Sequence, residues 1–276
     1  MKTDRPRAGL SAGWHIPLIF MVAVSVLPIL FALLTSFKGM QDIFGGRFFS
    51  SAFTLENYRS IQNQLPVARI ALNSLLVASV VTFFKLTTST LAAYAFAYYD
   101  FRGKSLLYYV LISTIFIPFT VTMIPNYLII SKLRLFDTIW GVVLPELADA
   151  SGIFLLRQSM RSIPKALTEI ADLDGVGRMR TLRDIVLPVC RPSLTATGII
   201  FFINNWNEYV WPTLILRTKE RYTLPLAMQL FSSAEAGSEF TMIMAMAVLT
   251  MLAPVVLYLI FQRYIMSTFA SSGIKG

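Results

Sequence analysis

The sequence predicts an all-α membrane protein with six transmembrane helices. Apolar residues make up 55% of its 276 residues and charged residues only 14%, whereas a soluble domain has about 25% charged residues. This composition excludes a soluble enzyme and a disordered chain, and the single cysteine, Cys190, excludes a disulfide scaffold. The net charge of +9 indicates basic residues near a membrane face rather than a nucleic-acid partner.

Six segments are long enough to cross a membrane, which takes about 20 apolar residues. They run over 16–35, 70–99, 106–131, 138–156, 192–216 and 240–262. The first is uncharged and too long for a signal peptide, so we expect a retained helix. The second contains only Lys85, and the third and sixth contain no charge. The fourth is interrupted by Glu146, Asp149 and Pro145, and the fifth carries only Glu208.

The basic residues predict which side of the membrane each loop faces. With both termini in the cytoplasm, the inner segments hold 14 lysines and arginines and the outer segments hold nine, as the positive-inside rule requires. We therefore expect a cytoplasmic N-terminus over 1–15, an outer loop over 36–69, a core over 70–262 and a cytoplasmic tail over 263–276.

The inner loop over 162–188 has the pattern of two short amphipathic helices joined by a glycine turn. Ser162 and Pro164 are typical of a helix start, and the apolar residues within 166–171 follow at helical spacing. Gly175 ends this helix, because glycine tolerates a positive φ. The second helix places the apolar residues of 179–186 on one face. Such a pair either lies on the membrane surface without a partner or docks into a groove of a cytoplasmic protein.

The same loop resembles the E-A-A-x3-G-x9-I-x-L-P loop of bacterial ABC importer permeases. The matching segments are Glu169-Ile170-Ala171, Gly175 and Ile185-Val186-Leu187-Pro188, with Ile170 in place of the usual alanine. Further landmarks resemble the carbohydrate-type branch, which includes the smaller permease of the maltose importer. They lie at 35–38, 54–58, 73–74, 101–104, 206–212 and 273–276.

This resemblance implies the type I ABC importer transmembrane fold, with the inner loop as a coupling helix in a cleft of the ATP-hydrolysing subunit. The implied coupling residues are Glu169, Ala171, Asp174, Gly175, Leu187 and Pro188. The implied partners are a second homologous permease, two copies of the ATP-binding subunit and an extracytoplasmic solute-binding protein. The implied location is the inner membrane of a bacterium or archaeon, in contact with lipid, with the tail near the ATP-binding subunit.

The chain is not expected to be an enzyme or to bind a cofactor itself. The segment 102–105 resembles a phosphate-binding loop only in part, because the required upstream glycine is replaced by Tyr98. ATP and magnesium would therefore bind to the partner subunit. We expect no catalytic residue and no metal site, since His15 is the only histidine.

The fifth predicted span contains a stretch in which aromatic and hydrogen-bonding side chains alternate. Sugars are bound by these two kinds of side chain together, so the stretch is a hypothesis for the translocation pathway of a carbohydrate or polyol. The candidates are Asn205, Trp206, Asn207, Glu208 and Trp211. In the alternative interpretation, the aromatic residues form an interfacial belt and Glu208 caps the backbone before Pro212.

Charged residues inside spans are costly and are functional hypotheses by default. Lys85 either pairs with Glu146 or Asp149, or these two acids line a solute cavity, or Lys85 extends to the interface with the acids near the outer surface. The same charges would serve as ion sites in a secondary transporter, which is the main alternative function but has no use for the inner loop.

The outer loop over 217–239 contains the apolar run Leu224-Pro225-Leu226 and, further on, Phe231. These residues would provide apolar contact for a binding protein. A plain solvated hairpin is the alternative for this loop.

Overall fold

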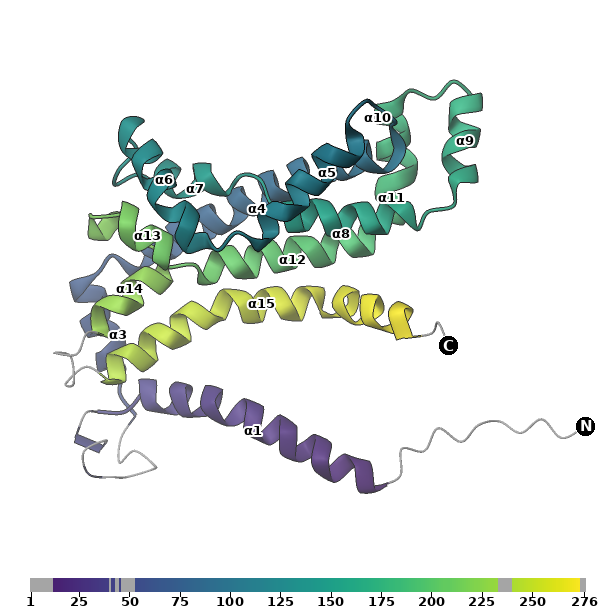
Figure 1. Ribbon diagram of the computed structural model, residues 1–276. Helices are drawn as coiled ribbons and strands as arrows, with labels where there is room; N and C mark the ends of the chain where they lie inside the picture. Colours follow the sequence, from purple (N-terminus) through teal and green to yellow (C-terminus); the bar gives the residue numbers. More distant parts are fainter. Residues whose placement is uncertain (1–11, 40, 43–44, 46–52, 233–239, 274–276) are drawn as a thin grey trace, which may run out of the picture. The chain divides into compact units, whose positions relative to one another are not determined.

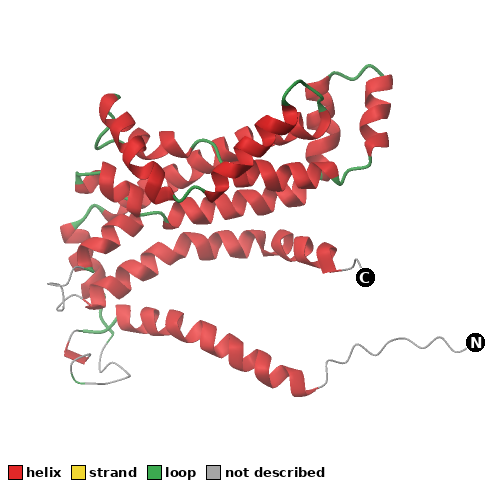
Figure 2. Cartoon of the chain, viewed as in Figure 1, coloured by secondary structure: helices red, strands yellow, loops and turns green. Residues whose placement is uncertain are grey.

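The computed structural model describes residues 12–39, 41–42, 45, 53–232 and 240–273, which form helices and loops without a strand among them (Figure 2). The all-α prediction is confirmed for this part of the chain. The predictions for the N-terminal residues 1–11, and for the last tail residues 274–276, lie outside the described residues.

Three helices are long and apolar enough to cross a membrane without a break. They are α1 (Ala12–Ser36), α4 (Val67–Tyr98) and the first part of α15 (Phe240–Gly273), up to Gln262. These correspond to the first, second and sixth predicted spans.

Three further candidates are pairs of helices joined at a sharp bend. The first pair, α5 (Lys104–Ser113) with η1 (Thr114–Phe116) and then α6 (Phe119–Lys132), bends by 100°. The second, α7 (Ile139–Val143) with η2 (Leu144–Glu146) and then α8 (Ala150–Arg161), bends by 45°. The third joins Arg178–Val189 to α12 (Arg191–Asn207) at 81°. The described residues thus reach six spans only if each bent pair is counted as one.

Prolines account for two of these breaks. Pro118 precedes α6 with an extended backbone (φ −61°, ψ 141°), and Pro145 lies in η2. A proline lacks the N–H that would continue the helix, and it restricts the residue before it. The fifth predicted span is interrupted as well, because α12 ends at Asn207 and α13 (Val210–Ile215) begins after two non-helical residues.

The chain divides into two compact units, residues 1–64 with 231–250 and residues 65–230 with 251–276. In the first unit, Asn57 of α3 (Glu56–Gln64) donates hydrogen bonds to the carbonyls of Ser36, at 2.8 Å, and Lys38, at 2.9 Å. The hydroxyl of Tyr58 donates to that of Ser36 at 2.8 Å. The last carbonyls of a helix need such partners, so the landmarks at 35–38 and 54–58 form one structural contact at the end of α1.

The second unit is built around α4, which packs against α8 and α12 (Figure 1). Two buried clusters fill it. One is centred on Val81, Ile130, Val143, Trp211 and Ile215, and the other on Tyr94, Leu156, Met160, Leu182 and Val186. Because α4 contributes to both clusters, it is the common support of the unit.

The landmark at 73–74 fixes the loop that follows α13. The side-chain amide of Asn73 donates to the carbonyls of Glu220, at 2.9 Å, and Tyr222, at 3.1 Å. The hydroxyl of Ser74 accepts a hydrogen bond from the N–H of Leu224 at 2.6 Å. Leu224 opens α14 (Leu224–Phe231), and both Leu224 and Leu226 are buried. The prediction that these leucines offer apolar contact to a binding protein is therefore wrong, and so is that of a plain hairpin.

Asp137 also binds the loop that follows α13. Its carboxylate accepts hydrogen bonds from the N–H groups of Arg217, at 2.8 Å, and Thr218, at 3.0 Å, from the Thr218 hydroxyl and from the Arg221 guanidinium. Desolvation acts to raise the pKa of Asp137, but these hydrogen bonds and the charge of Arg221 outweigh it and hold the pKa below its ordinary value. The carboxylate therefore stays ionised at neutral pH and holds the loop.

Side chains of α4 and α12 lie close against the backbone of α8 at Gly152. A Cβ atom added there would overlap Phe201 Cζ of α12 and lie 2.6 Å from Ser89 Oγ of α4. Glycine thus permits a distance between these helices that a larger residue prevents.

We predict that Gly152→Ala destabilises the protein by about 1–3 kcal/mol, the usual cost of overpacking. The measurement is the thermal unfolding midpoint in detergent or nanodiscs. Gly198→Ala on α12 is the matched control, since its Cβ would lie 3.5 Å from Leu86 Cδ2, which is an ordinary contact. Equal midpoints for Gly152→Ala and Gly198→Ala would contradict the prediction.

Candidate functional site

The inner loop contains a short helix with an apolar face that the chain itself leaves uncovered. This helix, α9 (Lys165–Leu173), buries Ala171, which is 3% exposed. Leu167, Ile170 and Leu173 are 43%, 55% and 86% exposed. Adjoining exposed apolar residues are typical of an interaction surface. The helix predicted from the spacing of these residues is confirmed.

The turn after α9 is closed by Gly175, as predicted. Gly175 has a φ of +68°, and the N–H of Val176 donates to the carbonyl of Ala171 at 2.9 Å. This hydrogen bond and the left-handed residue before Val176 are the mark of a Schellman turn. The turn fixes the direction in which the chain leaves α9, with Asp174 exposed beside it.

The second predicted helix forms in three pieces, α10 (Arg178–Thr181), the π-helical segment η3 (Leu182–Val186) and α11 (Leu187–Val189). Leu182 and Val186 are buried, but Met179, which was predicted to share their face, is 68% exposed. A π turn takes more residues than an α turn, so a stripe at regular α spacing does not stay on one face. Leu187 packs against the buried cluster around Met160, and Pro188 is exposed.

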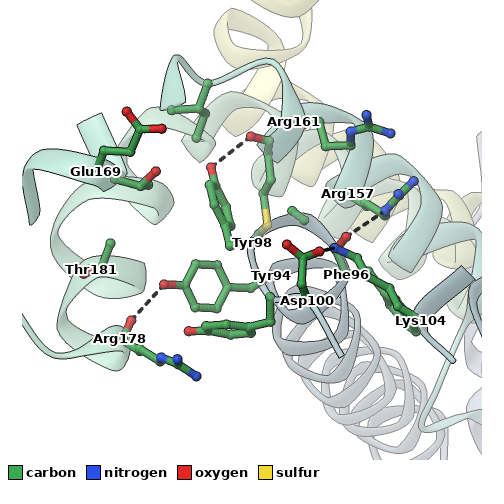
Figure 3. Close-up of a pocket in the computed structure, with 15 residues that line it drawn as sticks. Tyr94, Phe96, Tyr98, Asp100, Lys104, Arg157, Arg161, Glu169, Arg178 and Thr181 are labelled. Carbon is green, nitrogen blue, oxygen red and sulfur yellow. Dashed lines mark hydrogen bonds and ion pairs between the residues drawn. The ribbon is translucent and has the colours of Figure 1, made fainter. Parts of the chain in front are cut away.

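A cavity of about 620 Å³ lies between the inner loop and the end of α4 (Figure 3). Its charged lining residues are Lys104, Arg157, Arg161, Arg178, Asp100 and Glu169. Figure 3 shows Glu169 on one wall, with Arg157 and Arg161 beyond Tyr98 on the other. The two arginines therefore face a cavity that also carries the glutamate of the E-A-A segment.

Several of the basic residues around this cavity already have partners. Lys104 pairs with Asp100 at 3.1 Å. Arg157 donates to the carbonyl of Phe96 at 3.2 Å and lies 3.9 Å from the centre of the Tyr108 ring. Arg178 lies 4.5 Å from the centre of the Tyr99 ring. Cation–π contacts of this kind hold the guanidinium groups in place.

The second candidate site is an ionic cluster halfway along α4. The ammonium group of Lys85 lies 2.6 Å from Glu146 Oε2 and 3.7 Å from Asp149 Oδ2, and Lys85 as a whole is only 7% exposed. It also lies 5.8 Å from the centre of the Phe201 ring. The predicted pairing of Lys85 with these acids is present, so Lys85 does not extend to an interface.

Residues of this cluster and its neighbours on α4 provide hydrogen-bond partners for the backbone groups at the break between η2 and α8. Asp149 caps α8, accepting from the N–H groups of Ser151, at 2.8 Å, and Gly152, at 3.1 Å, and from the Ser151 hydroxyl. From α4, the hydroxyl of Thr88 donates to the carbonyl of Leu147 and that of Ser89 to the carbonyl of Asp149. In a membrane, such a break is tolerated only when its polar groups find partners in the protein.

Thr88 and Ser89 were not among the residues predicted for this site. They follow Lys85 at positions i+3 and i+4, which lie on one side of a helix. Three polar residues at this spacing inside an apolar span form a sequence pattern from which the polar site on α4 was predictable.

Glu208 caps a second break, between α12 and α13. Its Oε1 accepts from the N–H groups of Val210, at 2.7 Å, and Trp211, at 3.1 Å. The capping interpretation of Glu208 is therefore realised. Nearby, the side-chain amide of Asn205 donates to the carbonyl of Phe201 at 2.6 Å.

The two tryptophans of the fifth predicted span are packed inside the chain. Trp211 is 1% exposed, and its ring N–H donates to the carbonyl of Gly141 at 3.2 Å. Trp206 is buried as well and stacks on Phe202 at a centroid distance of 5.8 Å. Asn207 is exposed. In this conformation the tryptophans contribute to packing, and Asn207 is the side chain open to the surroundings.

A small cavity brings several of the predicted pathway residues together. Its volume is about 10 Å³, and Glu146, Asn205, Glu208 and Trp211 line it. This volume is near the minimum that holds one water molecule. No group of three His, Cys, Asp or Glu side chains that would suit a metal ion occurs among the residues that the structure describes.

Comparison with known proteins identifies one family that the chain matches. Residues 85–269 match the family described as "Binding-protein-dependent transport system inner membrane component". The sn-glycerol-3-phosphate transport system permease protein UgpE of Yersinia pestis bv. Antiqua (strain Antiqua) is 34% identical over 272 residues, which cover 94% of this chain and 95% of the relative. The arabinooligosaccharides transport system permease protein AraQ of Halalkalibacterium halodurans is 29% identical over 262 residues, covering 93% and 94% of the two chains.

Solved structures show the same fold. A chain of a bacterial ABC transporter involved in the import of the acidic polysaccharide alginate matches with a TM-score of 0.78 and 22% identity, covering 91% of this chain and 94% of the other. A chain of a bacterial alginate ABC transporter in complex with an alginate pentasaccharide-bound periplasmic protein matches with a TM-score of 0.67 and 13% identity, covering 90% and 92%. The type I importer fold expected from the inner loop is therefore confirmed.

We predict that Lys85→Met destabilises the protein by about 3–5 kcal/mol, because it leaves the charge of Glu146 without its partner. Lys85→Met with Glu146→Gln should recover part of this loss, since the unpaired charge is then removed. The measurement is a double-mutant cycle on the free energy or midpoint of unfolding.

Lys104→Met is the control for this cycle, because its pair with the fully exposed carboxylate of Asp100 is worth about 0–1 kcal/mol. A Lys85→Met variant no less stable than Lys104→Met would show that the buried pair does not hold the break.

Proposed function

The chain belongs to the family of binding-protein-dependent transport system inner membrane components, and from this premise we propose that it is one permease subunit of an ATP-driven importer for a carbohydrate or related polyol. The observation that carries the ATP-driven mechanism is the uncovered apolar face of α9 beside the Schellman turn at Gly175. A short helix with this face fits a groove of another protein, and ion-gradient transport gives it no role.

In this proposal α9 is the coupling helix and docks into a separate ATP-binding subunit. The coupling residues are Glu169, Ala171, Asp174, Gly175, Leu187 and Pro188. The exposed leucines and isoleucine of α9 supply apolar contact, and the turn fixes the register of the helix in the groove. ATP and magnesium bind to the partner subunit, and the permease moves because ATP favours one of its two conformations.

The proposed solute class rests on the relatives and on the polar groups inside the second unit. One relative is named for sn-glycerol-3-phosphate and another for arabinooligosaccharides, and both kinds of compound carry more than one hydroxyl group. We assign the pathway to the two helix breaks, where carboxylate and amide side chains gather. The assigned residues are Lys85, Glu146, Asp149, Asn205, Trp206, Asn207, Glu208 and Trp211, with the two tryptophans forming the packed wall.

The complete transporter would contain further chains. We propose a second homologous permease, two copies of the ATP-binding subunit and an extracytoplasmic solute-binding protein that delivers the solute. Both termini of this chain would lie in the cytoplasm, on the same side as α9 and its ATP-binding partner.

Purification from the native membrane followed by reconstitution tests this function. We expect the chain to co-purify with a second permease and an ATP-binding subunit. In proteoliposomes with the binding protein, import of radiolabelled sn-glycerol 3-phosphate or an arabino-oligosaccharide should require ATP inside the compartment that α9 faces. Uptake driven by an ion gradient without ATP would overturn the proposal in favour of a secondary transporter.

We predict that Gly175→Ala weakens binding of the ATP-binding subunit, because a residue with a side chain at φ +68° costs about 1–2 kcal/mol and alters the turn. This corresponds to roughly a five- to thirtyfold loss of affinity. Binding of the purified subunit to the permease in nanodiscs measures it.

Gly177→Ala is the matched control for this variant. A Cβ atom at either glycine meets nothing within 4 Å, but Gly177 has an ordinary φ of −61°. We expect Gly177→Ala to bind like the wild type, and an equal loss in both variants would show that the left-handed turn is not the cause.

A further inference from the structure

Two tyrosines at the end of α4 are hydrogen-bonded to the chain before and after α9. The hydroxyl of Tyr98 donates to the carbonyl of Met160 at 2.9 Å, in the last turn of α8 just before the loop (Figure 3). The hydroxyl of Tyr94 donates to the carbonyl of Arg178 at 3.0 Å, at the first residue of α10, which follows the turn after α9. Tyr94 and Tyr98 are one helical turn apart, so a single stretch of α4 contacts the chain on both sides of α9.

A cavity separates α9 from α4, so the contacts between these helices depend on the segments that flank α9. Thr168 and Glu169 of α9 line it on one side and Tyr94 and Tyr98 of α4 on the other. A cavity of about 620 Å³ transmits no force by packing, because its walls do not touch. Movement of α9 therefore reaches α4 through the segments before and after α9, where the tyrosine hydroxyls are bonded and where Leu182 and Val186 pack in the same cluster as Tyr94.

The tyrosine rings are anchored independently of their hydroxyl groups. Tyr94 belongs to the buried cluster with Leu156, Met160 and Leu182, and Tyr98 packs against the same cluster. Removing a hydroxyl group thus leaves the ring and its packing in place, so phenylalanine variants isolate the two hydrogen bonds.

Helix α4 connects the two tyrosine hydrogen bonds, which we call the tyrosine clamp, to the ionic cluster at Lys85. Lys85 and Tyr98 belong to the same unbroken helix, and 13 residues at about 1.5 Å each separate them by about 20 Å. An α-helix moves as one body over this distance. Displacement of the clamped end therefore shifts Lys85, and with it the backbone break that Lys85 holds through Glu146.

We propose that Tyr94 and Tyr98 are positioning residues that transmit the movement of α9 to α4 and, through Lys85, to the break between η2 and α8. This inference rests on the proposed function, in which an ATP-binding subunit moves α9. The tyrosines contact neither the solute nor ATP in this proposal. They act by keeping the inner loop and α4 at a fixed distance.

The test measures the distance between α9 and α4 in the whole transporter complex in nanodiscs. Spin labels are placed at Ala166→Cys on α9, which is exposed and is not one of the proposed coupling residues, and at the exposed Leu91→Cys on α4, in a Cys190→Ala background. Distances are recorded without nucleotide and with ATP plus vanadate. In the otherwise wild-type complex we expect the distance to stay the same, because the two helices move together.

In the Tyr94→Phe, Tyr98→Phe double variant we expect ATP plus vanadate to change or broaden the α9–α4 distance, while the unfolding midpoint stays near that of the wild type. Each single variant should give a smaller change. Tyr109→Phe is the control, because Tyr109 is 70% exposed on α5, and it should match the wild type. If the double variant does not fold, the single variants decide the question.

Phenylalanine variants whose α9–α4 distance responds to ATP plus vanadate like the wild type overturn the inference. Failure of the proposed function is a different result. In that case no ATP-binding subunit would co-purify, and no distance in the wild-type complex, including one from α9 to the partner permease, would respond to nucleotide.

Discussion

The second unit depends on one constraint, which is that the polar groups at a break in the helical backbone must find partners inside an apolar bundle. Between η2 and α8 the helical hydrogen bonds stop, and α4 supplies the missing partners from Lys85, Thr88 and Ser89. Without water in the membrane, an unpaired carbonyl or carboxylate costs several kcal/mol. The buried lysine, which is costly alone, becomes acceptable because it neutralises acids that the break itself requires.

Carboxylates perform the same task at both breaks near α4. Asp149 caps the start of α8 and Glu208 caps the start of α13, each binding two free N–H groups of a helix beginning. Asp149 was a pathway candidate because charge inside a span is expensive, and Glu208 because it lies in a stretch of aromatic and hydrogen-bonding side chains. The structure gives both acids a structural role as well. The N–H groups at the start of the second helix segment need a carboxylate cap before the break between the two segments is able to line a pathway.

The clamp at Tyr94 and Tyr98 and the cluster at Lys85 are two ends of one mechanical element. In the proposed mechanism the exposed apolar side of α9 faces a partner, the chain before and after α9 is hydrogen-bonded to α4, and α4 is bonded to the break. The cavity under α9 leaves the contacts on either side of it to connect α9 with α4. A rigid helix between two hydrogen-bonded sites is a simple way to relate an event at the membrane surface to a polar site within the membrane.

Local patterns in the sequence determined the helical class, the apolar segments, the turn at Gly175 and the choice of Lys85, Glu146 and Asp149 as a group. Hydropathy, periodicity and glycine geometry are properties of neighbouring residues, so these features needed no knowledge of the fold. Only the tertiary structure decided that the third and fourth predicted spans bend, that Met179 leaves the buried face, that Trp206 and Trp211 are packed, and that Thr88 and Ser89 complete the cluster. Each of these outcomes depends on contacts between residues far apart in the chain, whose energies no local pattern contains.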